Sequence, residues 1–235
     1  MSHNVAVRNT LLARLPSDEL ARIAPLLTTI SFSKGEVILR PHEPITRVVF
    51  PHGGIASVTV AMDDGRMVEV ATVGREGVVG LEAFLGDAIM PTETMVQVAD
   101  GAADAMPAEA FVREMHHPGP FQAAVLRYWQ GFQTLIMQST ACIALHPVHE
   151  RCCRWLLMAH DRVGQDRFPL SHEFLATMLG VSRPTVTVVA GTLQKAGLIQ
   201  YRHGQLTILD RRSLEEASCE CYASVRAQFD RLGLS

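Results

Sequence analysis

The spacing of apolar and polar positions divides the chain into a strand-rich N-terminal part and a helical C-terminal part. Across residues 28–107 apolar and polar residues alternate in short runs, and this period of two is typical of half-buried strands. Turns rich in glycine and proline separate the runs, and Asp64-Gly65 is typical of a β-hairpin. Many short strands at this spacing predict an antiparallel barrel or jelly roll. The expected strands cover residues 37–39, 48–50, 55–62, 67–73 and 95–99.

Helical spacing replaces this alternation at both ends of the chain. Within residues 9–27 we expect one or two short helices. The first would carry Leu11, Leu12 and Leu15 and end before Pro16, and Ser17 can cap a second one. Further helices are expected at residues 119–145, from residue 148 onward, and as one amphipathic C-terminal helix at 213–232.

The helix expected at residues 119–145 carries an apolar stripe whose positions recur at spacings of four and three. That heptad spacing is typical of two parallel helices in contact, so a homodimer is predicted. Packing of the same stripe on the chain's own strands is the alternative. His146-Pro147 ends this helix and is expected to act as a hinge. The predicted dimer contacts are Val125, Tyr128, Phe132, Leu135 and Ser139.

Residues 170–199 contain two short helical patterns separated by a turn at Gly180. Ser171 is placed to cap the first helix and Ser182 the second, whose first turn holds Pro184. Two short helices joined in this way predict a helix-turn-helix, whose second helix enters the major groove of DNA. The expected second helix spans residues 182–196.

Helical geometry identifies the side of this second helix that faces away from the core. At its start we expect Arg183 to contact a guanine edge, and Pro184 and Val188 to contact thymine methyl groups. Thr187 and Lys195 are the expected phosphate ligands. The full set of predicted DNA-binding residues is Ser171, Ser182, Arg183, Pro184, Thr185, Thr187, Val188, Lys195, Arg202 and His203.

The distribution of charge supports a nucleic-acid partner, although the total of −3 by itself argues against one. Residues 1–146 have a net charge of −5, whereas residues 147–235 have a net charge of +2. Residues 174–209 contain no Asp or Glu but include Arg183, Lys195 and Arg202. A surface that lies on phosphates should lack acidic residues in this way.

The LATMLGVSRPTV and LQKAGLI runs, with the QYRHGQLTI hairpin as a wing, resemble the winged helix-turn-helix of the Crp–Fnr superfamily of bacterial regulators. The KGEVIL, DDGR and VGREGVVG segments resemble the β-roll of that superfamily's effector domain. Where the cyclic-AMP receptor protein has a glutamate and an arginine, this chain has Pro184 and Val188, so the operator sequence cannot be carried over.

The resemblance implies an α+β fold, with an antiparallel, jelly-roll-like β-roll, a long dimerisation helix and a winged helix-turn-helix. The corresponding domains are an effector-sensing domain at residues 1–118, a dimerisation helix at 119–146 and a DNA-binding domain at 147–235. The implied function is transcription regulation by a homodimer, with double-stranded DNA and RNA polymerase as partners.

The segment that would hold a cyclic nucleotide departs from the superfamily's pattern. In nucleotide-binding members a glutamate contacts the ribose and an arginine contacts the phosphate; here those positions fall on Leu81 and Pro91. No Lys or Arg occurs between residues 75 and 113. An anionic ligand would therefore lack its charge-assisted partner, and we expect an effector other than cyclic AMP. The candidate pocket residues are Gly80, Leu81, Glu82, Pro91 and Thr92.

Other kinds of chemistry lack their sequence signals. No Walker loop, dinucleotide-binding fingerprint or nucleophile motif occurs, so we expect no catalytic residue and no cofactor. The five cysteines include no C-x2-C pair, and Cys152 falls on a core face, so no metal site is expected. A cupin-like barrel enzyme or metal-binding module, whose winged helix contacts protein, is the alternative.

The sequence shows no targeting signal, so we expect a cytoplasmic protein. The N-terminal residues contain no apolar run of signal-peptide length. Residues 128–149 lack Lys, Arg, Asp and Glu, but their glutamines and hydroxyl side chains are too polar for a membrane span. An odd number of cysteines without a secretory signal is typical of a reducing compartment.

Overall fold

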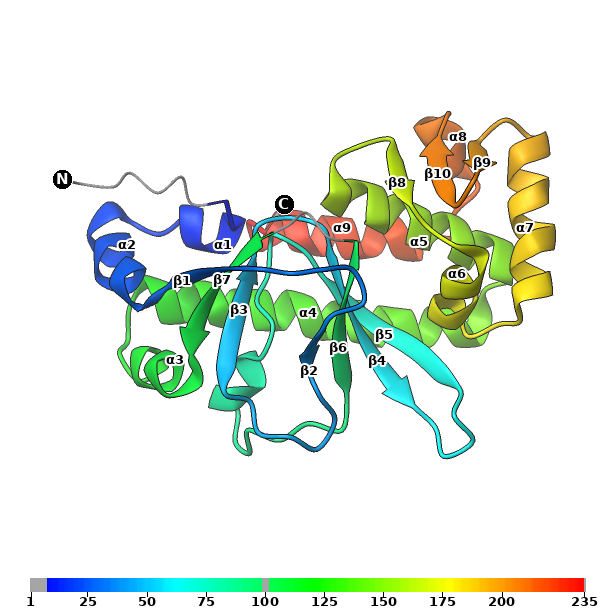
Figure 1. The fold of residues 1–235 in the computed structure, drawn as a ribbon. Helices are drawn as coiled ribbons and strands as arrows, with labels where there is room; N and C mark the ends of the chain where they lie inside the picture. Colours follow the sequence, from blue (N-terminus) through cyan, green and yellow to red (C-terminus); the bar gives the residue numbers. More distant parts are fainter. Residues whose placement is uncertain (1–7, 99–101, 235) are drawn as a thin grey trace.

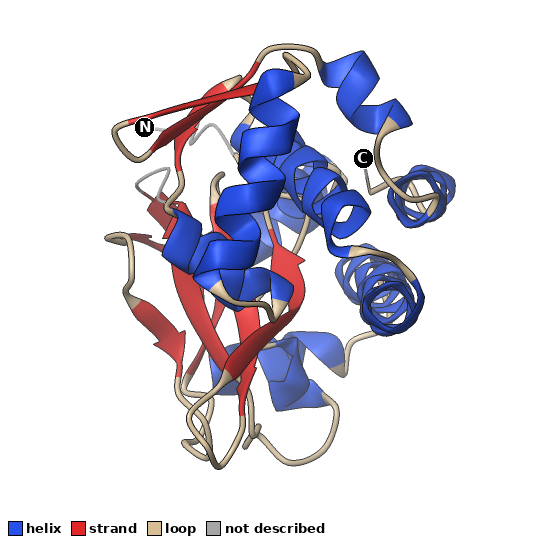
Figure 2. Ribbon diagram, turned by 90° about the vertical axis from the view of Figure 1, so that its right-hand side faces the viewer, coloured by secondary structure: helices blue, strands red, loops and turns tan. Residues whose placement is uncertain are grey.

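The computed structural model describes residues 8–98 and 102–234 (Figure 1). A β-rich N-terminal domain is followed by one long helix and then by a helical C-terminal domain that contains a small sheet. This α+β arrangement confirms the fold class predicted from the sequence. Figure 2 shows helices in front of, to the right of and below the strands.

Two antiparallel sheets build the N-terminal domain, with strand orders β1–β7–β3 and β2–β6–β4–β5. All five expected strands are present, and Gly65 in the β4–β5 turn has the positive φ of 83° that such hairpins require. β7 was not predicted, because its sequence AADAMP is poor in strand-forming residues; pairing with β1 and β3 on both sides holds it extended. The bounds are β1 Thr28–Ser31, β2 Val37–Leu39, β3 Arg47–Pro51, β4 Ile55–Ala61, β5 Met67–Val73, β6 Glu93–Val98 and β7 Ala102–Pro107.

Short helices cover one end of this domain, as Figure 1 shows at its left. Asn9 is fully buried at the start of the first of them. Its side-chain oxygen accepts a hydrogen bond from the Leu12 N–H at 3.1 Å, while its amide donates to the carbonyls of Pro51 and Gly77. One polar side chain thus both caps a helix and fastens it to the β-roll. The bounds are α1 Thr10–Ala13, α2 Ser17–Ile23, η1 Ala24–Leu26 and α3 Ala108–Met115.

The long helix α4 (Pro120–Leu145) runs along the β-roll and continues beneath the C-terminal domain (Figure 1). Its inward side chains are packed in the chain's own core, where the rings of Tyr128 and Phe132 stack with centroids 5.8 Å apart. The expected dimer contacts all lie on this buried face and are at most 8% exposed: Val125, Tyr128, Phe132, Leu135 and Ser139.

In the single chain this stripe packs on its own domain, which is the alternative that the sequence left open, so a dimer contact through it stays a prediction that its burial opposes. A spacing of three and four marks an apolar face of a helix. It does not say whether that face packs on its own chain or on a partner.

The C-terminal domain holds the two helices of the predicted motif and a three-stranded antiparallel sheet of order β8–β10–β9. The expected wing is the β9–β10 hairpin, whose turn at His203 and Gly204 has φ values of 50° and 75°. β8 was not predicted. The bounds are α5 Val148–Val163, β8 Arg167–Pro169, α6 His172–Leu179, α7 Arg183–Lys195, β9 Ile199–Arg202 and β10 Gln205–Ile208.

The single C-terminal helix expected at residues 213–232 is instead two helices, α8 (Arg211–Glu216) and α9 (Cys221–Arg231). On one continuous helix Cys219 and Cys221 would point about 200° apart. The break lets both side chains turn toward Cys142, and the three form a small buried cluster. α9 then lies beside α4 (Figure 1).

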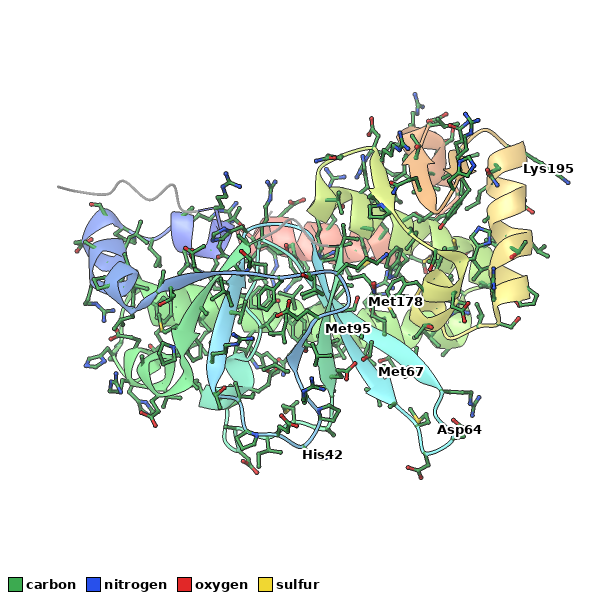
Figure 3. All side chains as sticks on the ribbon, viewed as in Figure 1. His42, Asp64, Met67, Met95, Met178 and Lys195 are labelled. Carbon is green, nitrogen blue, oxygen red and sulfur yellow. The ribbon has the colours of Figure 1, made fainter. Side chains whose placement is uncertain are left out.

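The C-terminal domain rests on the β4–β5–β6 face of the β-roll. Gln97 of β6 donates a hydrogen bond to the Met178 sulfur at 3.6 Å, and Figure 3 labels Met178 above these strands. Gly180 lies so close that a Cβ added there would meet Val68 at 3.2 Å. The N-terminal and C-terminal domains are thus in direct contact in this structure.

Candidate nucleic-acid interface

The two helices of the motif are capped as the sequence predicts. The Ser171 hydroxyl accepts a hydrogen bond from the Phe174 N–H at 3.2 Å, and the Ser182 hydroxyl accepts one from the Thr185 N–H at 3.4 Å. Between the helices Gly180 has a φ of 63°, the left-handed conformation that favours glycine at a helix end. α6 and α7 consequently meet at a bend of 106°, within the range of helix-turn-helix motifs.

α7 has one buried face and one exposed face, and it stands at the edge of the molecule away from the β-roll (Figure 1). Val188 is 70% exposed although it is apolar, and Lys195 projects outward from the end of the helix (Figure 3). The buried residues are Val186, Val189, Ala190 and Leu193. The exposed residues include Arg183, Pro184, Thr187, Val188 and Lys195, all predicted to face DNA.

The hydroxyl groups predicted to contact DNA already take part in hydrogen bonds within the motif. Thr187 donates to the Arg183 carbonyl at 3.1 Å and lies 3.1 Å from the His172 ring. Thr185 is half-buried, with its hydroxyl 2.8 Å from that of Ser182. These groups hold the motif together, and their contact with DNA stays a prediction.

Arg183 is paired in this structure with Glu173, with 3.5 Å between the two charged groups. Both side chains are well exposed. An exposed pair of this kind contributes only about 0–1 kcal/mol, so the guanidinium can exchange its partner at little cost. A guanine edge or a phosphate can therefore replace the carboxylate.

A polar groove beside the wing adds residues that sequence reasoning missed. Arg202 and His203 were predicted and are exposed here, but Arg167 comes from the three-residue strand β8. So short a strand has no detectable period, and only its pairing with β10 places Arg167 beside the wing. The groove is lined by Arg167, Gln200, Arg202, His203, Gln205 and Thr207.

Three of the predicted effector residues, Gly80, Leu81 and Glu82, lie at the start of one turn of 3-10 helix, η2 (Leu81–Phe84). Leu81 is 3% exposed and belongs to the hydrophobic core, whereas Pro91 is exposed and Thr92 half-buried. Gly80 starts the turn with a φ of 88°. Burial raises the pKa of the Glu82 carboxyl, so a negative charge is disfavoured at this place.

A cavity inside the β-roll is apolar and small. It encloses about 20 Å³, room for about one water molecule. A nucleotide does not fit there without movement of the strands. The lining residues include Phe32, Ile38, Ile55, Val96 and Val98.

Glu69 of β5 is a buried carboxyl at the contact between the two domains. It accepts a hydrogen bond from the Trp155 ring N–H of α5 at 2.7 Å and another from the Ser57 hydroxyl at 2.5 Å. Burial raises its pKa to about 7, although both hydrogen bonds oppose that shift. A glutamate within a strand pattern suggests a solvent-facing position, so the sequence did not reveal this contact.

Cys152 and Cys153 are buried in α5, as the sequence predicted for Cys152. Burial raises the pKa of the Cys153 thiol to about 11 and that of Cys152 further still. Both thiols are therefore protonated and unreactive at neutral pH.

Over the residues that the structure describes, no single helix is long and apolar enough to cross a bilayer; α6 and α7 reach that length and composition only together, across their sharp bend.

Two family models match the chain, one in each domain. Residues 29–117 match the cyclic nucleotide-binding domain, and residues 150–217 match the Crp-like helix-turn-helix domain. The transcriptional regulator SdrP of Thermus thermophilus is 26% identical over 192 residues, which cover 80% of this chain and 93% of that protein.

Solved structures share the fold. FixK2 from Bradyrhizobium japonicum superposes with a TM-score of 0.71 at 18% identity, over 82% of this chain and 98% of that chain. A chain from Eubacterium rectale, assigned to the Crp/Fnr family, gives a TM-score of 0.70 at 20% identity, over 89% and 98% of the two chains.

Glu69 should make stability depend on pH. Its pKa of about 7 in the folded chain exceeds the ordinary value of 4.5, so the unfolded carboxyl ionises first as the pH rises. The stabilising contribution is full below about pH 4.5 and is lost as the pH rises through about 7. Glu69→Gln should remove this slope and raise the free energy of unfolding near pH 8 by up to about 3 kcal/mol.

Urea denaturation at several pH values between roughly 5 and 8 measures the effect. Glu43→Gln, at an exposed position, is the matched control and should keep the wild-type slope. If Glu69→Gln differs from the wild type by the same amount at every pH, ionisation of Glu69 does not contribute to stability.

Proposed function

Because this chain belongs to the Crp/Fnr family of DNA-binding transcriptional regulators, we propose that it binds an inverted-repeat operator as a homodimer, with one α7 in each of two major grooves. It is a regulator and not an enzyme, so the cupin-like alternative is set aside. Its proposed place of action is the cytoplasm. Contact with RNA polymerase, which the family resemblance implies, stays a prediction.

The exposed face of α7 is the observation that carries this proposal. It presents Arg183 at the helix start, the end that meets base edges in this motif, and Lys195 at the other end. The wing adds Arg202, and no acidic residue occurs from residue 174 to residue 209. A helix of groove width that carries basic and no acidic residues supports binding to duplex DNA.

The outward face of α4 supports the dimer. Residues 128–149 contain no Lys, Arg, Asp or Glu, although the exposed face of a surface helix is normally charged. Met137 is 64% exposed there. A second heptad stripe runs along this face, with spacings of three and four: Leu126, Trp129, Gln133, Ile136, Thr140 and Ile143. All of its residues are exposed or half-buried in the single chain.

This outward stripe is the surface that we propose for a parallel contact with a second α4. It replaces the buried stripe in that role. The proposed division into a sensing domain at 1–118, a dimerisation helix at 119–146 and a DNA-binding domain at 147–235 follows the same elements.

We also propose that the effector is not cyclic AMP. Leu81 occupies the ribose-binding position but is part of the core, and Pro91 occupies the position of the phosphate-binding arginine. Next to Leu81, burial raises the pKa of the Glu82 carboxyl, so its surroundings disfavour negative charge. The cavity inside the β-roll, with room for about one water molecule, likewise offers no space for a nucleotide.

Substitutions at the two ends of α7 should separate base reading from phosphate binding. Arg183→Ala should weaken the preferred operator by about 1–3 kcal/mol and relax one base position, because a bidentate guanine contact is lost. Lys195→Ala should weaken all sequences alike and reduce the slope of affinity against salt by about one unit. Selection from random DNA pools, followed by mobility shifts, measures both; recovery of sequences without a repeated half-site would contradict the proposal.

Met137→Asp should dissociate the dimer, because it places an unpaired charge at the edge of the proposed helix contact. We expect a monomer by light scattering, and operator affinity lower by about 10²–10⁴-fold because two half-sites are no longer held together. Met62→Asp, at an exposed methionine of the β-roll, is the matched control and should stay dimeric. A dimeric Met137→Asp protein would place the contact elsewhere. Phe132→Asp is unsuitable, because that core position should unfold the chain instead.

Isothermal calorimetry with cyclic AMP and cyclic GMP tests the effector proposal on the purified chain. We expect no binding at micromolar ligand, because the missing arginine removes a charge-assisted contact worth about 1.5–3 kcal/mol. Micromolar binding that also tightens operator binding would overturn it.

A further inference from the structure

Three cysteines and one histidine converge where the end of α4 meets the start of α9. Cys142 lies in the last turn of α4 and His146 is its C-terminal cap, while Cys219 and Cys221 flank the beginning of α9. The side-chain nitrogen or sulfur atoms of all four lie within 4.8 Å of one another. The cysteines are buried and the histidine is half-buried. More than seventy residues separate the pair on α4 from the pair at α9, so the spacing in the sequence does not predict the cluster.

The distances fit a tetrahedral metal site. Zinc bonds of about 2.3 Å to sulfur and about 2.0–2.1 Å to nitrogen place two sulfur ligands about 3.8 Å apart, and sulfur and nitrogen about 3.6 Å apart. The Cys142 and Cys219 sulfurs are 3.5 Å apart, and His146 Nδ1 lies 3.5 Å from the Cys221 sulfur. Cys3His is also a common ligand set of structural zinc sites.

The surrounding groups match what a metal-bound histidine and thiolate need. The other ring nitrogen of His146, Nε2, lies 3.2 Å from the Glu220 carboxylate. That contact fixes the proton on Nε2 and leaves Nδ1 free to bind a cation, the arrangement that usually orients histidine ligands. Gln138 donates a hydrogen bond to the Cys221 sulfur at 3.0 Å, which stabilises a thiolate there.

The local charge also fits. Three thiolates and one neutral imidazole around a divalent ion carry a net charge of −1, which is costly to bury alone. Arg154 lies within electrostatic reach of Cys142 and is only 8% exposed. One of its nitrogens donates to the Ser139 hydroxyl, and its Nε has no hydrogen-bond partner among the described residues. A buried guanidinium beside the cluster offsets the negative charge of the metal complex.

We propose that Cys142, His146, Cys219 and Cys221 bind one Zn²⁺ per chain. The three thiol protons pass to solvent as the three sulfur–zinc bonds form, and no electron is transferred. The ion joins α9 to the end of α4, directly before the predicted hinge at Pro147. It thereby fixes how the DNA-binding domain is attached to the dimerisation helix.

Cobalt substitution tests the site in the full-length, untagged, reduced chain after treatment with a chelator. Co²⁺ should bind with one equivalent per chain and give a thiolate-to-cobalt charge-transfer band with tetrahedral d–d bands, and Zn²⁺ should abolish them. Cys221→Ser should lose the charge-transfer intensity that belongs to one thiolate. Cys153→Ser, at another buried cysteine, should keep the wild-type spectrum.

Substitution of a buried cysteine can unfold the chain, so a second variant tests the site from outside the core. Glu220→Gln serves for this, because the Glu220 side chain is exposed. Loss of the carboxylate behind His146 should weaken zinc binding by about 10–100-fold, measured against a chromophoric chelator, without changing circular dichroism. Glu216→Gln on α8 is its control. The proposal is overturned if Co²⁺ gives no thiolate band or if Cys221→Ser keeps the full band.

Discussion

The packing of α4 is the constraint on which the rest of the structure depends. Its inward face, with Tyr128 and Phe132 at its centre, is buried against the β-roll and α9 of the same chain. Burial of side chains of this size stabilises each by about 1.5–3 kcal/mol relative to exposure, so the helix cannot turn this face to a partner without unfolding its own domain. The outward face is left free, uncharged and regularly spaced, and it is the face that we propose for the dimer contact.

Two kinds of contact hold the C-terminal domain to the rest of the chain. At the β-roll, Glu69 joins β5 to Trp155 of α5 through a buried hydrogen bond. At the far end, the cluster around Cys142 joins the end of α4 to α9. We expect the first contact to respond to protonation of Glu69 and the proposed second one to respond to metal. Both act on the attachment of α7 rather than on α7 itself, whose own shape is set by the caps at Ser171 and Ser182.

The elements of this chain could be predicted because each depends on residues that are near one another in the sequence. Features that depend on contacts between distant segments could not be predicted. Serine caps, the glycine stop at Gly180 and the strand period each act within a few residues, so the helix-turn-helix, the wing and the five named strands could be predicted. The face of α4 that meets a partner could not, because residues 126–143 hold two heptad stripes and only folding decides which is buried. The Cys142 cluster, Arg167 beside the wing and the break before α9 likewise depend on pairing across the fold.

Hydroxyl-radical footprinting of the full-length protein on a selected operator tests the central claim most directly, since it shows where two copies of α7 lie on the duplex. The account predicts protections on both strands related by a two-fold axis, with half-site centres one helical turn apart, about 34–36 Å. A single protected patch without symmetry, or uniform protection regardless of sequence, would contradict it.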